Sequence, residues 1–191
     1  MLTDDDILWE WDRSGQDLFM LRYRPKRWRH ATAATDLVLD FKDGDSGALE
    51  VCAEILRDGL LSIAQKHPTT RIYLVPVPGH EVSSGDSPCH RAAQILEDRA
   101  ANPGPQVWDW SGRLSRCADI RKASKSLGNR PTEEEHYVTL CYSGGVMTER
   151  DVVVLLDDVY TSGATARACR RVLYENTRSS RIVGLFLSKT S

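Results

Sequence analysis

One segment constrains the fold of this chain more than any other: V-V-V-L-L-D-D-V-Y-T-S-G-A-T, from Val152 to Thr165. It begins with five apolar residues, a run that is too short to span a membrane and has the length of a buried parallel strand. Asp157 and Asp158 follow the run, and an Ala- and Arg-rich segment over 166–174 is predicted to be a helix. The order of strand, acid pair, hydroxyl-and-glycine turn and helix predicts a phosphate site at a helix N-terminus.

The residue types of the turn fit that chemistry. Gly163 allows the backbone to approach a phosphate closely and to adopt a positive φ. The acid pair suits a ribose diol, whose hydroxyls donate well to ionised acceptors, and it can also hold Mg²⁺, which prefers oxygen ligands. A turn that only caps the helix is the alternative, but capping needs one such residue rather than six. Further hydrogen bonds can come from three hydroxyls, those of Thr161, Ser162 and Thr165.

A second strand–loop–helix unit precedes this motif. Residues 72–75 are predicted to form a buried strand, and Pro76 and Pro78 prevent its continuation as a central strand. Gly79 opens a polar loop that leads to a helix predicted over 89–100. The two units therefore have the same layout, which favours a second anion-binding turn beside the first.

The alternation of strands and helices predicts an α/β fold. From residue 71 onward the pattern favours a mainly parallel central sheet with helices on both faces. Ligands bind such sheets at the carboxyl ends of strands near a switch in strand order, so the loops after Val75 and Leu156 are expected to meet at one edge. The remaining predicted elements are a helix over 48–63, with Asp45 or Ser46 as N-cap, and strands over 107–110, 136–142 and 182–187.

Composition limits the class of protein. The 191 residues suffice for one domain with a real core, and 41% hydrophobic with 27% charged residues is ordinary for a globular chain. A formal net charge of −2 gives no global basic field for nucleic acid. No apolar stretch has the length of a membrane helix, and the acidic start M-L-T-D-D-D is unlike a signal peptide, so we expect a cytoplasmic protein without a membrane partner.

The cysteines and histidines show no metal-ligand spacing. The cysteines occur singly, which argues against a zinc ribbon and a disulfide framework, and we expect all of them to be reduced and packed as small hydrophobes. Of the five histidines, only His80 and His90 lie near a proposed loop. The five cysteines are Cys52, Cys89, Cys117, Cys141 and Cys169.

Residues 1–35 are predicted to form an irregular, aromatic and basic N-terminal arm before a domain over 36–191. The cluster R-Y-R-P-K-R-W-R-H, Arg22 to His30, interleaves basic residues with Tyr23 and Trp28 and could stack on single-stranded nucleic acid. The alternative is an arm whose aromatics pack on the domain. We favour that alternative, because one short cluster makes few phosphate contacts.

The segment from Leu155 to Thr165 closely resembles the motif that binds 5-phosphoribosyl-1-pyrophosphate (PRPP) in type I phosphoribosyltransferases: an apolar strand, two acids, a spacer and T-[TS]-G-x-T. V-P-V-P-G-H, from Val75 to His80, is similar to a segment of the ComF-like branch of that family, which is linked to competence and DNA uptake in bacteria. The resemblance extends over about 37–190 through D-F-K-D-G-D at 40–45, the basic L-x-R region at 114–130 and the closing L-F-L-S-K-T.

The resemblance implies a type I phosphoribosyltransferase-like fold and a transferase that moves ribosyl phosphate from PRPP to an acceptor, usually a nitrogenous base, with release of pyrophosphate. It implies Mg²⁺ held by Asp157 and Asp158, and catalytic roles for these two residues and Arg91. The PRPP-binding residues would be Asp157, Asp158, Thr161, Ser162, Gly163, Ala164 and Thr165 in the motif, and Pro76, Val77, Pro78 and Gly79 in the second loop.

The chain departs from the ComF-like pattern in two places. It lacks the four-cysteine zinc module, and where those proteins carry R-G-x-N-Q it reads P-C-H-R-A-A-Q, in which Arg91 and Gln94 fill part of the role. The candidates for a basic side chain that offsets the charge of the leaving pyrophosphate are Arg91, Arg121 and Lys122. A mobile cover over the site is expected within 113–135.

These departures leave two alternatives to an enzyme. One is a PRPP or nucleotide sensor that has lost transfer activity. The other is a ComF-like accessory protein in DNA uptake or nucleic-acid processing, which would use the N-terminal cluster and the stretch from Arg113 to Arg130. A homodimer is left open.

Overall fold

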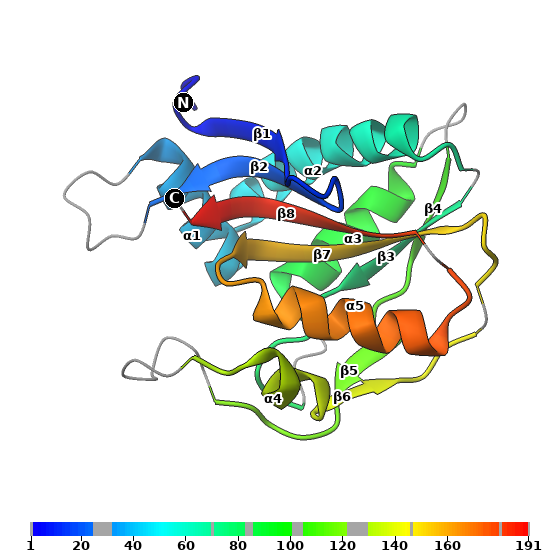
Figure 1. Cartoon of the computed structure of the whole chain (residues 1–191). Coiled ribbons are helices and arrows are strands. Elements are labelled where there is room, and N and C mark those ends of the chain that lie inside the picture. The colour runs from blue at the N-terminus through cyan, green and yellow to red at the C-terminus, as the bar shows by residue number, and fades with distance from the viewer. Residues whose placement is uncertain are drawn as a thin grey trace.

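A six-stranded, mainly parallel sheet forms the centre of the computed structural model of the chain (Figure 1). The structure describes residues 2–24, 32–69, 71–82, 86–100, 105–121, 130–145, 147–179 and 181–190. The sheet order is β1-β2-β8-β7-β3-β4, and only β1 runs antiparallel to its neighbour. The strands are β1 (Ile7–Trp11), β2 (Asp17–Tyr23), β3 (Arg71–Pro76), β4 (Gln106–Asp109), β7 (Val152–Tyr160) and β8 (Ile182–Thr190).

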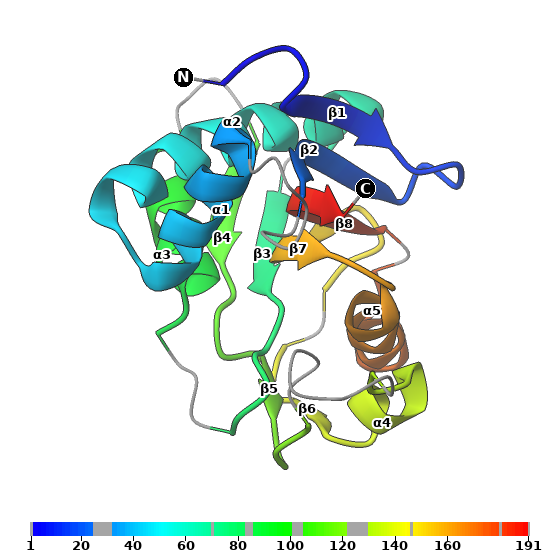
Figure 2. The ribbon, with the colours of Figure 1, turned by 90° about the vertical axis from the view of Figure 1, so that its left-hand side faces the viewer.

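Helices cover both faces of this sheet, as Figure 2 shows. One face carries α1 (Ala33–Asp43), α2 (Ser46–Lys66) and α3 (Pro88–Asp98). The other carries α5 (Ala164–Asn176), beside which lie the short helix α4 (Glu133–Tyr137) and a two-stranded sheet of β5 (Leu114–Arg116) and β6 (Leu140–Tyr142). The predicted α/β class, the mainly parallel sheet and the helices on both faces are confirmed.

The sequence explains the first two helices through their caps and their spacing. Gly44 adopts the left-handed conformation that ends α1, and the Asp45 side chain accepts a hydrogen bond from the Ala48 N–H at the start of α2. Of the two residues predicted as N-cap, Asp45 and Ser46, the structure therefore has Asp45 in that position. Apolar residues at helical spacing then bury one face of α2, as predicted. Among the helices in the described ranges, none is both long and apolar enough to cross a membrane.

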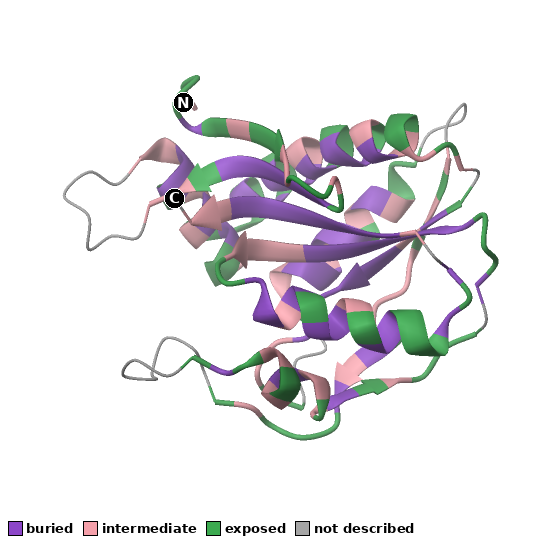
Figure 3. Cartoon of the chain, in the orientation of Figure 1, coloured by how far each residue is buried: buried purple, intermediate pink, exposed green. Residues whose placement is uncertain are grey.

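The apolar run of β7 packs against both helical layers. Val152, Val154 and Leu156 belong to the core under α1, α2 and α3, whereas Val153 and Leu155 face α5. A strand buried on both faces must be apolar at every position, which accounts for a continuous run rather than an alternating one. Figure 3 shows the same burial along the central strands.

The prediction of an irregular arm is wrong for residues 7–23, which form β1 and β2. The apolar run from Leu18 to Leu21 is buried, and β2 pairs in parallel with β8. The polar and glycine residues that suggested irregular structure make the turn between the two strands, where Asp12 Oδ1 accepts from the Gln16 N–H at 2.7 Å. Residues 25–31, which hold most of the basic cluster and Trp28, lie outside the described residues.

The predicted strand over 136–142 is wrong at its start. Thr132 and Glu135 form a capping box, in which each side chain accepts a hydrogen bond from the other residue's backbone N–H. This cap begins α4, which ends at Tyr137, and β6 starts only at Leu140. The other predicted strands and helices are present with boundaries shifted by a few residues.

Candidate functional site

The order of the strands switches between β3 and β7. From β3 the chain moves outward to β4, whereas from β7 it moves to β8 on the opposite side. The two strands are parallel neighbours with Pro76 opposite Leu156, and the Val77 N–H donates to the Leu156 carbonyl at 2.8 Å. The loops that follow them therefore leave the sheet at one edge, as the sequence predicted.

A cavity of about 310 Å³ opens at this edge. Its volume lies at the lower end of the range for small-ligand sites. Eight of the residues that the sequence singled out for PRPP line it, five from the motif and three from the second loop: Asp157, Asp158, Thr161, Ser162 and Thr165, with Val77, Pro78 and Gly79. The structure thus brings the two predicted loops to one cavity.

The acid pair lies on β7 itself, because the strand continues through it to Tyr160. Burial and the neighbouring charge of Asp158 raise the pKa of Asp157 above its usual range, although the Asp158 N–H donates to Asp157 Oδ1 at 2.9 Å. Lys42, at the end of α1, places its Nζ 3.4 Å from Asp158 Oδ2. Burial opposes the charge on Lys42, but the two carboxylates outweigh it and raise the pKa of the ammonium group.

The turn after β7 adopts the predicted conformation. Gly163 has φ of 73° and is the N-cap of α5, and a Cβ at this position would collide with the Tyr160 side chain. Gly163 supplies no capping side chain, and the Ala164 N–H at the start of α5 donates to the Ser162 hydroxyl at 3.4 Å. The first turn of α5 therefore directs its N–H groups towards the loop. Gly163 and Ala164 line a smaller cavity of about 30 Å³ that shares Asp157 and Thr165 with the larger one.

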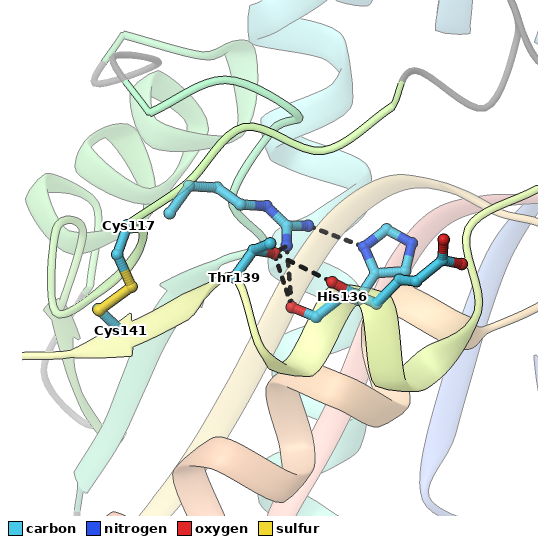
Figure 4. Close-up of a disulfide and its surroundings, with 6 residues drawn as sticks. Cys117, His136, Thr139 and Cys141 are labelled. Atoms are coloured by element: carbon cyan, nitrogen blue, oxygen red, sulfur yellow. Dashed lines mark hydrogen bonds between the residues drawn. A yellow bond between two sulfur atoms is a disulfide. The ribbon is translucent and has the colours of Figure 1, made fainter.

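A module that we call the hood, residues 111–121 and 130–145, forms the opposite wall and contains β5, α4 and β6. A disulfide joins Cys117 to Cys141 beside Thr139 and His136 (Figure 4). The expectation that all five cysteines are reduced is therefore wrong for this pair. Pairing of β5 with β6 brings the two Cα atoms to 5.7 Å, a proximity that single, scattered cysteines do not reveal.

The other three cysteines are free and buried, as expected, at positions 52, 89 and 169. Burial raises the pKa of the Cys52 and Cys169 thiols to about 12. These two groups are therefore neutral, non-nucleophilic core residues at neutral pH.

Arg116 is the most buried cation of the cavity wall, with 4% of its surface exposed. Its Nε donates to the Gly79 carbonyl at 2.8 Å, and its Nη1 donates to the His136 carbonyl at 3.1 Å and to the Thr139 hydroxyl. Burial lowers its pKa, and no carboxylate of the described residues opposes that effect. A buried guanidinium is thus held by neutral acceptors, so its charge remains available to the cavity.

His136 is a cavity residue that the sequence did not indicate. Its Nδ1 lies 2.9 Å from Arg116 Nη2, and its Nε2 lies 3.1 Å from the Thr165 hydroxyl. Burial, followed by the charge of Arg116, lowers its pKa to about 4. Of the two histidines considered from the sequence, His80 lines the cavity, whereas His90 lies on α3 and bonds to the Ser87 hydroxyl at 2.6 Å.

The structure does not bring Arg91 to the cavity. Its Nη1 is 3.5 Å from the Gly44 carbonyl and its Nε is 3.7 Å from Asp86 Oδ1, on the side of α3 that faces the α1–α2 loop. Arg121 does line the cavity, where it forms an ion pair of 2.8 Å with Glu135. Lys122, the third candidate, lies outside the described residues, as do residues 122–129 of the cover expected within 113–135.

No cluster of three or more His, Cys, Asp or Glu side chains among the described residues is arranged to hold a metal ion. The acid pair offers two carboxylates, which matches the way Mg²⁺ is usually bound, by one or two carboxylates together with substrate oxygens.

The chain was also compared with known proteins. A scan against models of known protein families finds no match, and a search of curated proteins finds no relative.

Proposed function

We propose that the protein binds PRPP in this cavity and transfers its ribosyl phosphate to an acceptor, usually a nitrogenous base, with release of pyrophosphate. The observation that carries the proposal is the meeting of the acid pair, the α5 turn and the Val77–Gly79 loop in one cavity at the strand-order switch. The type I phosphoribosyltransferase-like fold, of the ComF-like branch, is part of the same proposal.

Each wall would hold a different part of the ligand. The carboxylates of Asp157 and Asp158 would accept hydrogen bonds from the ribose hydroxyls. The N-terminal turn of α5 would bind the 5′-phosphate, since its N–H groups and the helix dipole favour an anion. The Val77–Gly79 loop, with Arg116 and Arg121 above it, would face the pyrophosphate.

Catalysis in such a site would be positional and electrostatic. Breaking the bond to pyrophosphate leaves positive charge on the ribose and builds negative charge on the leaving group. The hood arginines would stabilise the leaving group, and the two loops would hold the ribose in place for the acceptor. Mg²⁺, held by Asp157 and Asp158 together with ligand oxygens, would offset further charge on the pyrophosphate.

PRPP binding without transfer is the second candidate. The position of Arg91 favours this candidate, because the residue that partly replaces the missing family motif contacts Gly44 and Asp86 and does not line the cavity. Release of pyrophosphate distinguishes the two candidates, since a sensor binds PRPP and leaves it intact.

Isothermal titration with PRPP and Mg²⁺ tests the binding step. We expect saturable binding by the wild type and its loss in an Asp157→Ala/Asp158→Ala variant, because two carboxyl groups that accept hydrogen bonds are removed. Asp98→Ala is the matched control, since it removes an exposed carboxylate from the end of α3. No binding by folded wild-type protein would rule out the proposal. Where binding occurs, pyrophosphate release is then measured over a panel of nitrogenous bases.

A further inference from the structure

A chain of three polar side chains connects the hood to the PRPP-like motif. Arg116 on β5 contacts His136 on α4, and His136 contacts Thr165 in the first turn of α5. Arg116 and His136 are 4% and 9% exposed, and all three residues line the main cavity. Arg116 also donates to the Gly79 carbonyl, so this chain joins both ligand-facing loops to the hood.

The contact with Arg116 fixes the tautomer of His136. A guanidinium has only N–H donors, so the Nδ1 atom 2.9 Å from Arg116 Nη2 must accept a hydrogen bond. A neutral imidazole that accepts at Nδ1 carries its proton on Nε2. The opposite tautomer would set two buried donors against each other, and a buried donor left without an acceptor is costly.

The tautomer in turn fixes the role of the Thr165 hydroxyl. His136 Nε2 donates to Thr165 Oγ1 at 3.1 Å, so the oxygen is the acceptor in this contact. The hydroxyl's own hydrogen is then directed elsewhere, and Thr165 faces the cavity. One lone pair of this oxygen is thus occupied by His136, and the hydroxyl hydrogen is kept for a partner other than His136.

We propose that Arg116 and His136 are positioning residues that keep the hydrogen of the Thr165 hydroxyl free of His136 and available to donate into the cavity, so that this point favours a strong acceptor, such as an oxygen of an ionised phosphate. The identity of the ligand as a ribose phosphate rests on the proposed function. An ionised oxygen accepts the Thr165 hydrogen more strongly than a hydroxyl oxygen does, because hydrogen bonds to charged groups are stronger, so phosphorylated ribose is favoured over ribose.

The tautomer is measured first, on the protein without ligand. Two-bond ¹H–¹⁵N spectra of uniformly labelled protein separate protonated from unprotonated ring nitrogens, and comparison with His136→Gln assigns the signals of His136. We expect Nδ1 to be unprotonated and Nε2 protonated at pH 7, and Arg116→Met to abolish this preference. A proton on Nδ1 in the wild type would overturn the proposal.

Binding of ribose 5-phosphate, measured by isothermal titration, tests the action through Thr165. We expect His136→Leu to weaken binding about tenfold or more, because a hydrogen bond to a charged group loses its geometry. His136→Gln keeps an N–H donor for Thr165 and should retain most of the affinity. In a Thr165→Val background, His136→Leu should cause no further loss, whereas losses that add would overturn the proposal.

Further variants separate this role from a merely structural one. Thr165→Ser keeps the hydroxyl and should bind like the wild type. If His136→Leu does not fold, the cycle is run with Arg116→Met and Thr165→Val, which remove the first and last members of the chain. If folded wild type binds neither ribose 5-phosphate nor PRPP, the proposed function fails, and the ring-nitrogen spectra alone decide whether the hydroxyl hydrogen is kept free of His136.

Discussion

The two walls of the cavity carry opposite charge. The sheet wall presents the carboxylates of Asp157 and Asp158, whereas the hood wall presents the cations of Arg116, Arg121 and Arg130. Carboxylates accept hydrogen bonds from hydroxyls, and guanidinium groups donate to anions. A ligand that satisfies both walls therefore combines hydroxyl groups at one end with phosphate groups at the other. A uniformly anionic or uniformly neutral molecule would leave one wall without partners.

The walls also differ in how they are held. The sheet wall is part of β7, which pairs with a parallel neighbour on each side and is buried over its first five residues. The hood contacts α5 through His136 and Thr165 and packs Leu114 and Leu140 in the core beside that helix. Its other ties to α5 include exposed ion pairs, Arg167 with Glu133 at 2.7 Å and Arg171 with Glu134 at 2.9 Å. Because exposed pairs contribute little, we expect the hood to open at a lower free energy than the sheet wall.

Removing the disulfide should have the largest effect on the difference in opening free energy between the hood and the sheet wall. Cys117 and Cys141 close a loop with a sequence separation of 24, for which loop-closure entropy gives about 3.5 kcal/mol of stabilisation. In a Cys117→Ser/Cys141→Ser variant we expect faster hydrogen exchange in β5, α4 and β6 and little change in β7 and β8. A reducing agent should act on the wild type in the same way and leave the variant unchanged. Equal loss of protection in β7 would mean that hood and sheet unfold as one unit.

The hood wall should lose stability in acid because of His136. The pKa of His136 in the folded protein, about 4, lies below the ordinary value of 6.5. Its contribution to the free energy of unfolding is therefore complete above pH 6.5 and is lost as the pH falls through 4. The difference corresponds to up to about 3 kcal/mol, since a tenfold change in proton affinity is worth about 1.4 kcal/mol. Denaturant titrations from pH 7 to pH 4 should show a shallower decline in stability for His136→Gln than for the wild type. Parallel pH profiles would contradict this prediction.

The sheet wall should behave in the opposite way because of Asp157. Burial and the charge of Asp158 raise the pKa of Asp157 in the folded protein. Its contribution to the free energy of unfolding is therefore complete below the ordinary pKa of 3.8 and is lost as the pH rises through the raised pKa. We therefore expect Asp157→Asn to be more stable than the wild type at pH 8, by about 1 kcal/mol or more, while it loses PRPP affinity. Thermal unfolding of the variant and the wild type at pH 4 and pH 8 measures this difference in stability, which should vanish at pH 4. A variant less stable than the wild type at pH 8 would show that the carboxylate is better satisfied than its burial implies.

The same contrast decides what the sequence could predict. The sheet wall is built from one continuous stretch of sequence that holds the strand, the acid pair, the turn and the helix. Spacing and residue type were therefore enough to place Asp157, Gly163 and the start of α5. Pro76 ended β3 for an equally local reason, because proline cannot donate to the sheet ladder. Local signals of this kind also predicted the α/β class and the edge at which the two loops meet.

The hood wall could not be predicted in this way, because its contacts join residues that are distant in sequence. The disulfide depends on the pairing of β5 with β6, and the contact between His136 and Thr165 depends on the packing of α4 on α5. Arg91 was selected through a resemblance alone, and its side chain turns towards Gly44 instead. The apolar run of β2 was missed because aspartate, glycine and arginine residues in the same segment suggested irregular structure, whereas partner strands on both sides stabilise it.

The smallest expected effect comes from Lys42, the cation behind the sheet wall. Lys42→Met keeps much of the aliphatic stem and removes the charge 3.4 Å from Asp158 Oδ2. Without that charge the acid pair holds protons more tightly, so the pH at which PRPP binding is half-maximal should move upwards. Because the pair is partly exposed, we expect a loss of about 1 kcal/mol or less at pH 7, which shrinks as the pH is raised.

Lys42→Arg is the matched control, since it keeps the charge and should leave the pH profile of PRPP binding where the wild type has it. Titrations with PRPP and Mg²⁺ between pH 6 and pH 9 measure the shift. A loss of affinity that stays constant over this range would mean that Lys42 contacts the ligand directly. The sheet wall would then carry a cation of its own, and the contrast between an acidic and a basic wall would have to be redrawn around Lys42.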